Sequence, residues 1–235
     1  MEAADKRREL AEVATRVAGC RDCALSTGRT NSVPGEGSPD AEIMFIGEGP
    51  GFYEDQQGRP FVGASGKFLD ELLVSISLDR RKVFIGNVVK CRPPNNRDPQ
   101  PDEIEACRKH LDAQIGIIAP KVIVTLGRHS MQRYFPGEAI SRIHGQPRRT
   151  KDQQIIVPMY HPAAALHQGN LRKVIEADFR RLPEFLARAL GTAAPAAAAA
   201  PSVPAHLRAG SAQPPPSGAG QSNEQESEPQ QMRLL

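Results

Sequence analysis

This 235-residue sequence lacks long apolar runs and lacks a large excess of charge of either sign. No stretch of about 18 consecutive apolar residues occurs, which argues against a membrane span. The first 20 residues carry charges throughout and lack the apolar core of a secretory signal peptide. The net charge is only +3, so the composition permits binding to a polyanion without requiring it. We therefore expect a cytoplasmic protein that does not enter a membrane.

Large apolar residues are also scarce from residue 191 onward. That segment contains an alanine run, three consecutive prolines and the polar stretch QSNEQESEPQQ. Its few large apolar side chains cannot bury enough surface to offset the entropy lost on ordering. We expect residues 1–190 to form one folded domain and residues 191–235 to form a disordered tail.

Strand and helix patterns alternate through the first 190 residues. Apolar runs predict strands at 42–47, 82–90, 121–127 and 154–161, and helical spacing predicts helices at 3–18, 65–76, 101–120, 129–135 and 171–190. Strands separated by helices imply right-handed crossovers and a parallel sheet covered on both faces. Ligands of such α/β sheets bind at the carboxyl ends of the strands, and functional residues are expected there.

Cysteine is rare but patterned. Cys20 and Cys23 form a C-x2-C pair, Cys91 follows the second predicted strand, and Cys107 lies 16 positions later. Disulfides rarely persist in the cytosol, and four thiolates suit either a tetrahedral zinc or an iron–sulfur cluster. The spacing does not decide between the two, and four buried free cysteines are the structural alternative. A metal here would act chiefly as a staple between the first helix and distant segments.

Polar and glycine-rich residues follow the predicted strands. The glycines of GEGPG (47–51) let the backbone turn sharply and approach a ligand closely, and the loop lacks the lysine of a phosphate-binding loop. Glu48 follows the first strand, Asn87 lies near the end of the second, and His161 ends the fourth. Taken singly, each has an ordinary structural explanation. Their shared position at strand ends is what indicates a site.

In combination, the segments GEGPG, EDQQGRPFVG, GKFLDELL, NVVKCRPPNNRDP and HPAAAL, together with the cysteine pattern, resemble the four-cysteine family 4 uracil-DNA glycosylases. The resemblance covers residues 20–186. It implies an α/β fold, a three-layer αβα sandwich around a four-stranded parallel sheet. It also implies a [4Fe–4S] cluster held by Cys20, Cys23, Cys91 and Cys107.

The same resemblance implies a function in base excision repair. A monomeric, monofunctional enzyme would hydrolyse the N-glycosidic bond of uracil in single- or double-stranded DNA and leave an abasic site. No nucleophilic lysine occurs in the matching motifs, so we expect no lyase activity. The uracil has to leave the base stack before its glycosidic bond can be reached, so a pocket must hold the flipped base.

The resemblance also assigns the base-binding residues. Gly47 and Gly49 would line the pocket, Phe61 would stack on the uracil, and Asn87 would read its N3–H and O4 edge. His161 would donate a hydrogen bond near uracil O2, where anionic charge develops as the bond breaks.

A carboxylate is expected to orient the attacking water. Glu48 is the first choice and Asp55 the second. Gly49 stands where the best-known uracil glycosylases place their water-activating acid, so this chain departs from that arrangement.

The sequence leaves open a zinc-stapled hydrolase that uses Glu48 and His161, and two further alternative functions. His144, in the segment SRIHG, matches the R-I-H sequence of a glycosylase-like class that becomes covalently trapped on uracil-DNA. The loop is not the basic KRRIH of that class and position 49 is not glutamine, so we interpret His144 as an accessory residue at the abasic sugar or the DNA backbone. The second alternative is a non-catalytic iron–sulfur module that binds nucleic acid.

The segment QMRLL, residues 231–235, resembles the short peptides by which bacterial repair proteins dock on the sliding clamp. Such a peptide needs a glutamine for hydrogen bonds and apolar side chains to fill a small pocket. A flexible linker would let the catalytic domain search nearby DNA at high effective concentration. The residues that would make the contact are Gln231, Met232, Leu234 and Leu235.

Overall fold

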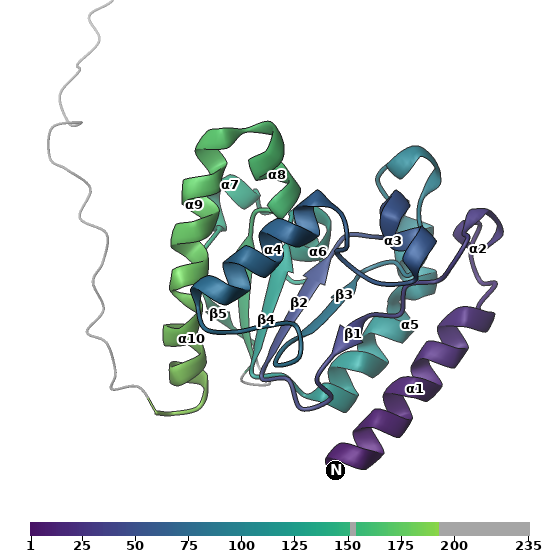
Figure 1. Ribbon diagram of the computed structural model, residues 1–235, viewed down its shortest axis with the longest axis horizontal. Helices are drawn as coiled ribbons and strands as arrows, with labels where there is room; N and C mark the ends of the chain where they lie inside the picture. Colours follow the sequence, from purple (N-terminus) through teal and green to yellow (C-terminus); the bar gives the residue numbers. More distant parts are fainter. Residues whose placement is uncertain (151–153, 193–235) are drawn as a thin grey trace, which may run out of the picture. The chain divides into compact units, whose positions relative to one another are not determined.

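A six-stranded mixed sheet organises the computed structural model, which describes residues 1–150 and 154–192 (Figure 1). The strands lie in the order β1-β3-β2-β4-β6-β5. The four central strands are parallel, and their bounds are β2 (Ile43–Gly47), β3 (Phe84–Asn87), β4 (Val122–Leu126) and β6 (Ile155–Met159). The predicted four-stranded parallel sheet is therefore confirmed.

Two short antiparallel strands extend the sheet beyond the prediction. They are β1 (Glu36–Gly37), which pairs with β3, and β5 (Arg148–Arg149), which pairs with β6. Each contains two residues, too few for an alternating hydrophobic pattern to be recognised in the sequence.

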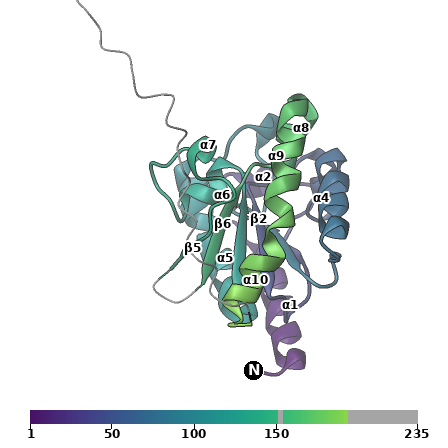
Figure 2. The ribbon, with the colours of Figure 1, turned by 90° about the vertical axis from the view of Figure 1, so that its left-hand side faces the viewer.

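Helices cover both faces of the sheet (Figure 2). Their bounds are α1 (Ala3–Gly19), α2 (Leu25–Gly28), α3 (Phe52–Gln57), α4 (Ala64–Ser75), α5 (Pro101–Ile118), α6 (Arg128–Gln132), α7 (Ile140–Ile143), α8 (Pro162–His167), α9 (Gly169–Arg180) and α10 (Leu182–Ala189), with a 3-10 turn η1 at Pro94–Asn96. Alternate strand residues point to opposite faces. Phe45 packs in the cluster formed with α4, α9 and α10, whereas Met44 and Ile46 pack in the cluster formed with α5 and α6.

Two predicted elements differ from those observed. The predicted helix 171–190 is two helices, α9 and α10, which meet at Arg181. Pro183 lies in the first turn of α10, where its missing N–H and fixed φ are tolerated, but it cannot continue α9. The second difference is the short helix α3, which lies between the first predicted strand and the helix predicted at 65–76, where no helix is predicted.

The described residues belong to one compact unit. None of the described helices is long and apolar enough to cross a membrane. The predicted tail and its clamp-binding peptide lie almost wholly outside the described residues.

Candidate active site

A cavity of about 360 Å³ opens at the carboxyl ends of the parallel strands. It gathers residues from the β2–α3 loop, the β3–α5 loop and the start of α8. Five of the predicted site residues line it, namely Glu48, Gly49, Phe61, Asn87 and His161. The remaining lining residues are Pro50, Gly51, Glu54, Ser65, Pro93, Asn96, Arg97 and Ala163.

Asn87 carries a buried acceptor without a partner. It ends β3 opposite Gly47 of β2 and is 2% exposed. Its Oδ1 atom has no hydrogen-bond partner in the structure. A Cβ atom at Gly47 would lie 2.4 Å from this oxygen and 2.8 Å from the ring of Phe61, so only glycine leaves room for both. Because buried polar atoms are normally paired, this carbonyl oxygen is available to a donor in the cavity.

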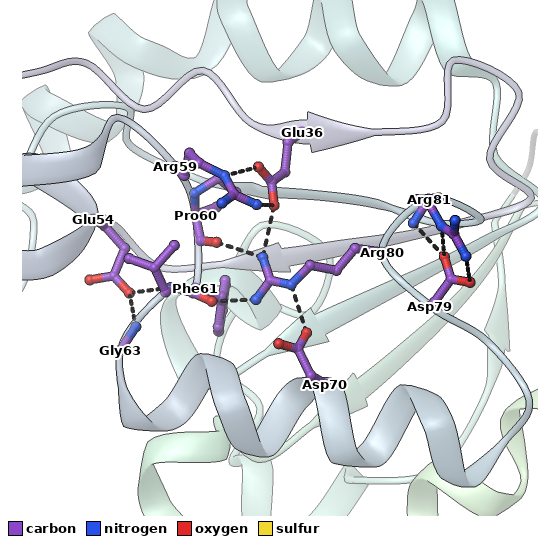
Figure 3. Close-up of polar contacts among 11 residues, drawn as sticks. Glu36, Glu54, Arg59, Pro60, Phe61, Gly63, Asp70, Asp79, Arg80 and Arg81 are labelled. Carbon is purple, nitrogen blue, oxygen red and sulfur yellow. Dashed lines mark hydrogen bonds and ion pairs between the residues drawn. The ribbon is translucent and has the colours of Figure 1, made fainter.

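Phe61 adopts a backbone conformation that is uncommon for a residue with a side chain, with φ of 53°. Its surroundings hold it in place, as Figure 3 shows. Arg80 donates hydrogen bonds to the carbonyl groups of Pro60 and Phe61. Glu54 accepts hydrogen bonds from the N–H groups of Val62 and Gly63, at 2.9 and 3.2 Å.

Arg80 is itself held by two carboxylates. Its Nε donates to Asp70 at 2.6 Å and its Nη1 donates to Glu36 at 2.9 Å (Figure 3). A Cβ atom at Gly66 would lie 1.8 Å from the Phe61 carbonyl oxygen, so the first turn of α4 packs directly against this backbone. The ring of Phe61 is thus a preorganised, buried surface at the cavity.

His161 is the N-cap residue of α8. Its Nδ1 accepts the N–H of Ala163 at 3.1 Å, so the hydrogen of the neutral ring resides on Nε2. Burial lowers the pKa of His161 to about 4, which keeps the ring neutral at physiological pH. The ring stacks on Phe61 with centroids 5.4 Å apart. His161 therefore offers the cavity a neutral donor held by helix capping.

Glu48 follows β2 at the mouth of the cavity. Burial raises the pKa of its carboxyl group, and nearby Asp98 raises it further, whereas His129 and Arg128 oppose the shift. The Nε2 atom of His129 lies 3.8 Å from Glu48 and 3.4 Å from Asp98. A carboxylate with a raised pKa in a cavity is suited to orient and deprotonate water.

Gly49 lines the cavity at a point of close packing. A Cβ atom there would lie 2.8 Å from Cγ2 of Val89. A side chain at position 49 therefore requires the Val89 side chain to shift, and with glycine at this position a water-orienting acid has to come from another residue.

Asp55 does not line the cavity. It is 2% exposed, and its two carboxylate oxygens accept the N–H groups of Thr30 and Asn31, at 2.9 to 3.3 Å. These bonds tie α3 to the segment after α2. Its neighbour Glu54 lines the cavity instead, a residue that sequence reasoning missed because the EDQQ segment gives no sign of which acid faces inward.

His144 is not among the residues that line the cavity. Its Nδ1 bonds Asp178 at 2.8 Å and its ring packs on Tyr160 with centroids 4.8 Å apart. A carboxylate partner orients an imidazole but does not bring it to the reacting base.

The four cysteines line one small cavity, together with Arg29, Lys90 and His110. A tetrahedral zinc with Zn–S bonds of about 2.3 Å holds its sulfurs about 3.8 Å apart. Within the part of the chain that the structure describes, no three of the cysteine sulfurs lie within 4.8 Å of one another. This spacing is wider than a single tetrahedral zinc needs.

Two N–H donors reach the cysteine sulfurs. Arg29 donates to Cys91 at 3.0 Å, and the backbone N–H of Lys90 donates to Cys107 at 3.3 Å. Arg29 also bonds the carbonyl groups of Val17, Ala18 and Cys20 at the end of α1. Such donors are the usual partners of cluster thiolates. Burial raises the pKa of the free Cys107 thiol to about 11, so a metal would be needed to hold it as a thiolate.

Comparisons with known proteins show the family of this chain. The family model for the uracil DNA glycosylase superfamily matches residues 34–182. A type-4 uracil-DNA glycosylase of Sulfurisphaera tokodaii is 54% identical over 75% of this chain and 84% of its own length. Its counterpart in Saccharolobus solfataricus is 50% identical over 74% of this chain and 85% of its own. A third, in Archaeoglobus fulgidus, is 45% identical over 75% and 92%.

Proposed function

The chain belongs to the uracil-DNA glycosylase superfamily, with type-4 enzymes among its relatives, and we infer from this premise that it excises uracil from DNA in base excision repair. The observation that carries the inference is the unpaired Oδ1 atom of Asn87 in a cavity shared with Phe61 and His161. The reaction hydrolyses the bond between uracil N1 and the sugar C1′ and leaves an abasic site.

Asn87 and Phe61 bind the flipped base in this proposal. The Asn87 carbonyl accepts the uracil N3–H, and its amide donates to O4. Cytosine has no N3–H and carries an amino group in place of O4. Its N3 acceptor would face the Asn87 carbonyl oxygen and its amino group would face the Asn87 amide NH2, so neither hydrogen bond would form. Phe61 stacks on the ring and contributes base affinity without distinguishing the bases.

His161 and Glu48 perform the chemistry. As the C1′–N1 bond breaks, charge develops on uracil O2 and the sugar acquires oxocarbenium character. The neutral Nε2–H of His161 stabilises that oxyanion without being transferred, since a ring with a pKa of about 4 is a hydrogen-bond donor at neutral pH. Glu48 orients a water toward C1′ and accepts its proton.

We propose that Cys20, Cys23, Cys91 and Cys107 hold a [4Fe–4S] cluster. Support comes from their shared cavity, the spacing of the sulfurs and the N–H donors from Arg29 and Lys90. The cluster would supply cohesion, because it joins the end of α1, the β3–α5 loop and α5. The cluster would take no part in the hydrolysis itself.

The remaining features of the proposal rest on the sequence. The enzyme acts as a cytoplasmic monomer with a domain over residues 1–190, and residues 191–235 tether the peptide 231–235 to the sliding clamp. The clamp contact is tested by measuring binding of the 231–235 segment to purified clamp, with Gln231, Leu234 and Leu235 changed to alanine as the control. Equal binding by the two peptides, or none by either, would retire it.

Uracil excision is tested on single-stranded and double-stranded DNA that contains one uracil. We expect the strand to break only after treatment with alkali or heat, because a monofunctional glycosylase leaves an intact abasic strand. Breakage without that treatment would contradict the hydrolytic mechanism. Intact strands after alkali would contradict glycosylase activity itself.

A further inference from the structure

Two exposed aromatic rings lie side by side at the edge of the cavity. Phe52 is 49% exposed and Tyr53 is 61% exposed, at the start of α3. Their ring centroids are 5.4 Å apart, with the planes at 79° to each other. In a chain with only 5% aromatic residues, such exposure is unusual, since aromatic rings contribute most when they are buried.

A positive charge accompanies the rings. The guanidinium carbon of Arg92 lies 5.1 Å from the centroid of Phe52, and its Nε donates to Asn96 at 2.7 Å. Arg92 therefore covers one part of the aromatic pair and is oriented by a residue that lines the cavity. Aromatic faces beside a guanidinium attract both nucleobases and phosphate groups.

The rings are continuous with the site already described. Pro50, Gly51 and Glu54 flank the pair in sequence and all line the cavity, while Pro93 and Asn96 do so beside Arg92. Figure 1 shows α3 next to the loop that joins β3 to α5, at the carboxyl end of the sheet. This edge therefore adjoins the cavity in which the proposed function places the uracil.

We propose that Phe52, Tyr53 and Arg92 form a stacking platform for a nucleotide adjacent to the flipped uracil. This inference rests on the proposed function. Flipping one base exposes the faces of its neighbours, and an aromatic platform replaces the stacking that they lose. Every base has a π face, so the platform binds the flanking base without selecting its identity. Arg92 meets the phosphate between the two nucleotides.

The test pairs protein variants with DNA that lacks one neighbouring base. Phe52→Ala combined with Tyr53→Ala removes both rings, whereas Phe52→Tyr combined with Tyr53→Phe exchanges them and keeps both π faces. Val74→Ala is the matched control, because Val74 is 69% exposed on the distal part of α4. The substrates are single-stranded oligonucleotides that contain one uracil, with either all bases present or a tetrahydrofuran abasic residue on the 5′ or 3′ side of the uracil.

With all bases present, we expect the double alanine variant to raise KM roughly tenfold with kcat within about twofold, since removing a stacking ring weakens nucleotide binding by about that factor. On DNA that lacks the stacked neighbour, the penalty should fall to about twofold or less. The exchanged variant and Val74→Ala should match the wild-type protein on every substrate.

The same penalty on all three substrates, or no penalty on any, would overturn the platform. Melting temperatures of the variants separate a loss of folding from a loss of stacking. DNA affinity measured by fluorescence anisotropy tests the platform without turnover. An absence of uracil excision by the wild-type protein would instead count against the proposed function, and the anisotropy comparison would still decide on the platform.

Discussion

At the scale of single residues, the candidate site contains polar groups of Asn87 and His161 that are available to a ligand. Asp55 illustrates the opposite case, because both of its carboxylate oxygens are occupied by backbone N–H groups. Asn87 keeps an unpaired carbonyl, and His161 uses one ring nitrogen for capping and keeps the other as a donor. An unpaired buried polar group costs stability, so its presence in a cavity indicates a use in ligand binding.

Asn87→Ala and His161→Ala are each expected to lower the excision rate by about 10²–10³, because each loses one preorganised hydrogen-bonding group. The fold should survive, since both side chains face the cavity. Single-turnover rates at saturating enzyme measure the loss, and melting temperatures close to that of the wild-type protein confirm folding. Near-wild-type rates for both variants would sink the assignment.

The excision rate is expected to fall at acid pH because of Glu48. Burial raises the pKa of this carboxyl above its ordinary value of 4.5, so more of it is protonated as the pH falls through the weakly acidic range. A protonated Glu48 cannot accept a proton from water. Rates measured across pH should therefore show an acid limb with a midpoint above 4.5.

Glu48→Gln is the matched variant for that measurement. It should be slower at neutral pH and should lack the acid limb, because the amide does not titrate. His161 remains neutral down to a pH of about 4 and does not produce a limb in this range. An unchanged limb in the variant would assign the titration to another group.

At the scale of elements, the segment between α3 and α4 is a loop with an uncommon backbone conformation. Its hydrogen bonds hold it as a rigid wall of the cavity. Arg80 and Glu54 bind its backbone from two sides, and α4 begins directly beneath it (Figure 3). Residues in uncommon backbone conformations persist only when their surroundings determine them fully. Phe61 is held in this way.

Gly66→Ala is expected to displace Phe61 and to lower kcat/KM for uracil excision, with little loss of stability in helix α4 itself. Its Cβ atom would lie 1.8 Å from the Phe61 carbonyl oxygen, so the loop has to move. Gly116→Ala in α5 is the control, since a Cβ atom there meets nothing within 4 Å. That control should gain up to about 1 kcal/mol of stability, because alanine favours helix over glycine. Equal kcat/KM for the two variants would contradict the role of the loop.

At the scale of the whole molecule, the cysteines join elements that are distant in the sequence. The end of α1, the β3–α5 loop and α5 meet at one cavity, and α1 packs on α5. Metal binding by such a set contributes to folding, because the unfolded chain does not hold the ligands together.

Cys107→Ala is expected to lose the iron of the proposed [4Fe–4S] cluster and the brown colour that the cluster gives. Its melting temperature should also fall. Ser26→Ala is the control, since Ser26 lines the same cavity but offers no sulfur. The control should retain its colour and its iron. Visible absorbance, metal analysis and thermal unfolding measure the three effects. A brown, fully stable Cys107→Ala protein would exclude Cys107 as a required ligand, and stoichiometric zinc in the colourless wild-type protein would replace the cluster with zinc.

Much of the architecture could be predicted from the periodicity of hydrophobic residues and from the residues that begin or end helices and strands. The four apolar runs became the four parallel strands, and α1, α4 and α5 lie close to their predicted bounds. The edge strands β1 and β5 could not be predicted, because two residues are too few to show the alternation of apolar and polar residues typical of a strand. The break between α9 and α10 required weighing Pro183 against a continuous helical pattern.

By itself, the sequence determined the fold class, the strand ends at which chemistry would lie, and the residues Glu48, Phe61, Asn87 and His161 as candidates. The fold class and the strand ends follow from local patterns, whereas Phe61 and the roles of all four residues follow from the resemblance to the family 4 enzymes. The tertiary structure decided which acids face the cavity, replacing Asp55 with Glu54 and placing His144 against Asp178. The direction of a side chain depends on partners brought together by folding, and the sequence EDQQ does not show that Glu54 faces the cavity while Asp55 binds the backbone of Thr30 and Asn31.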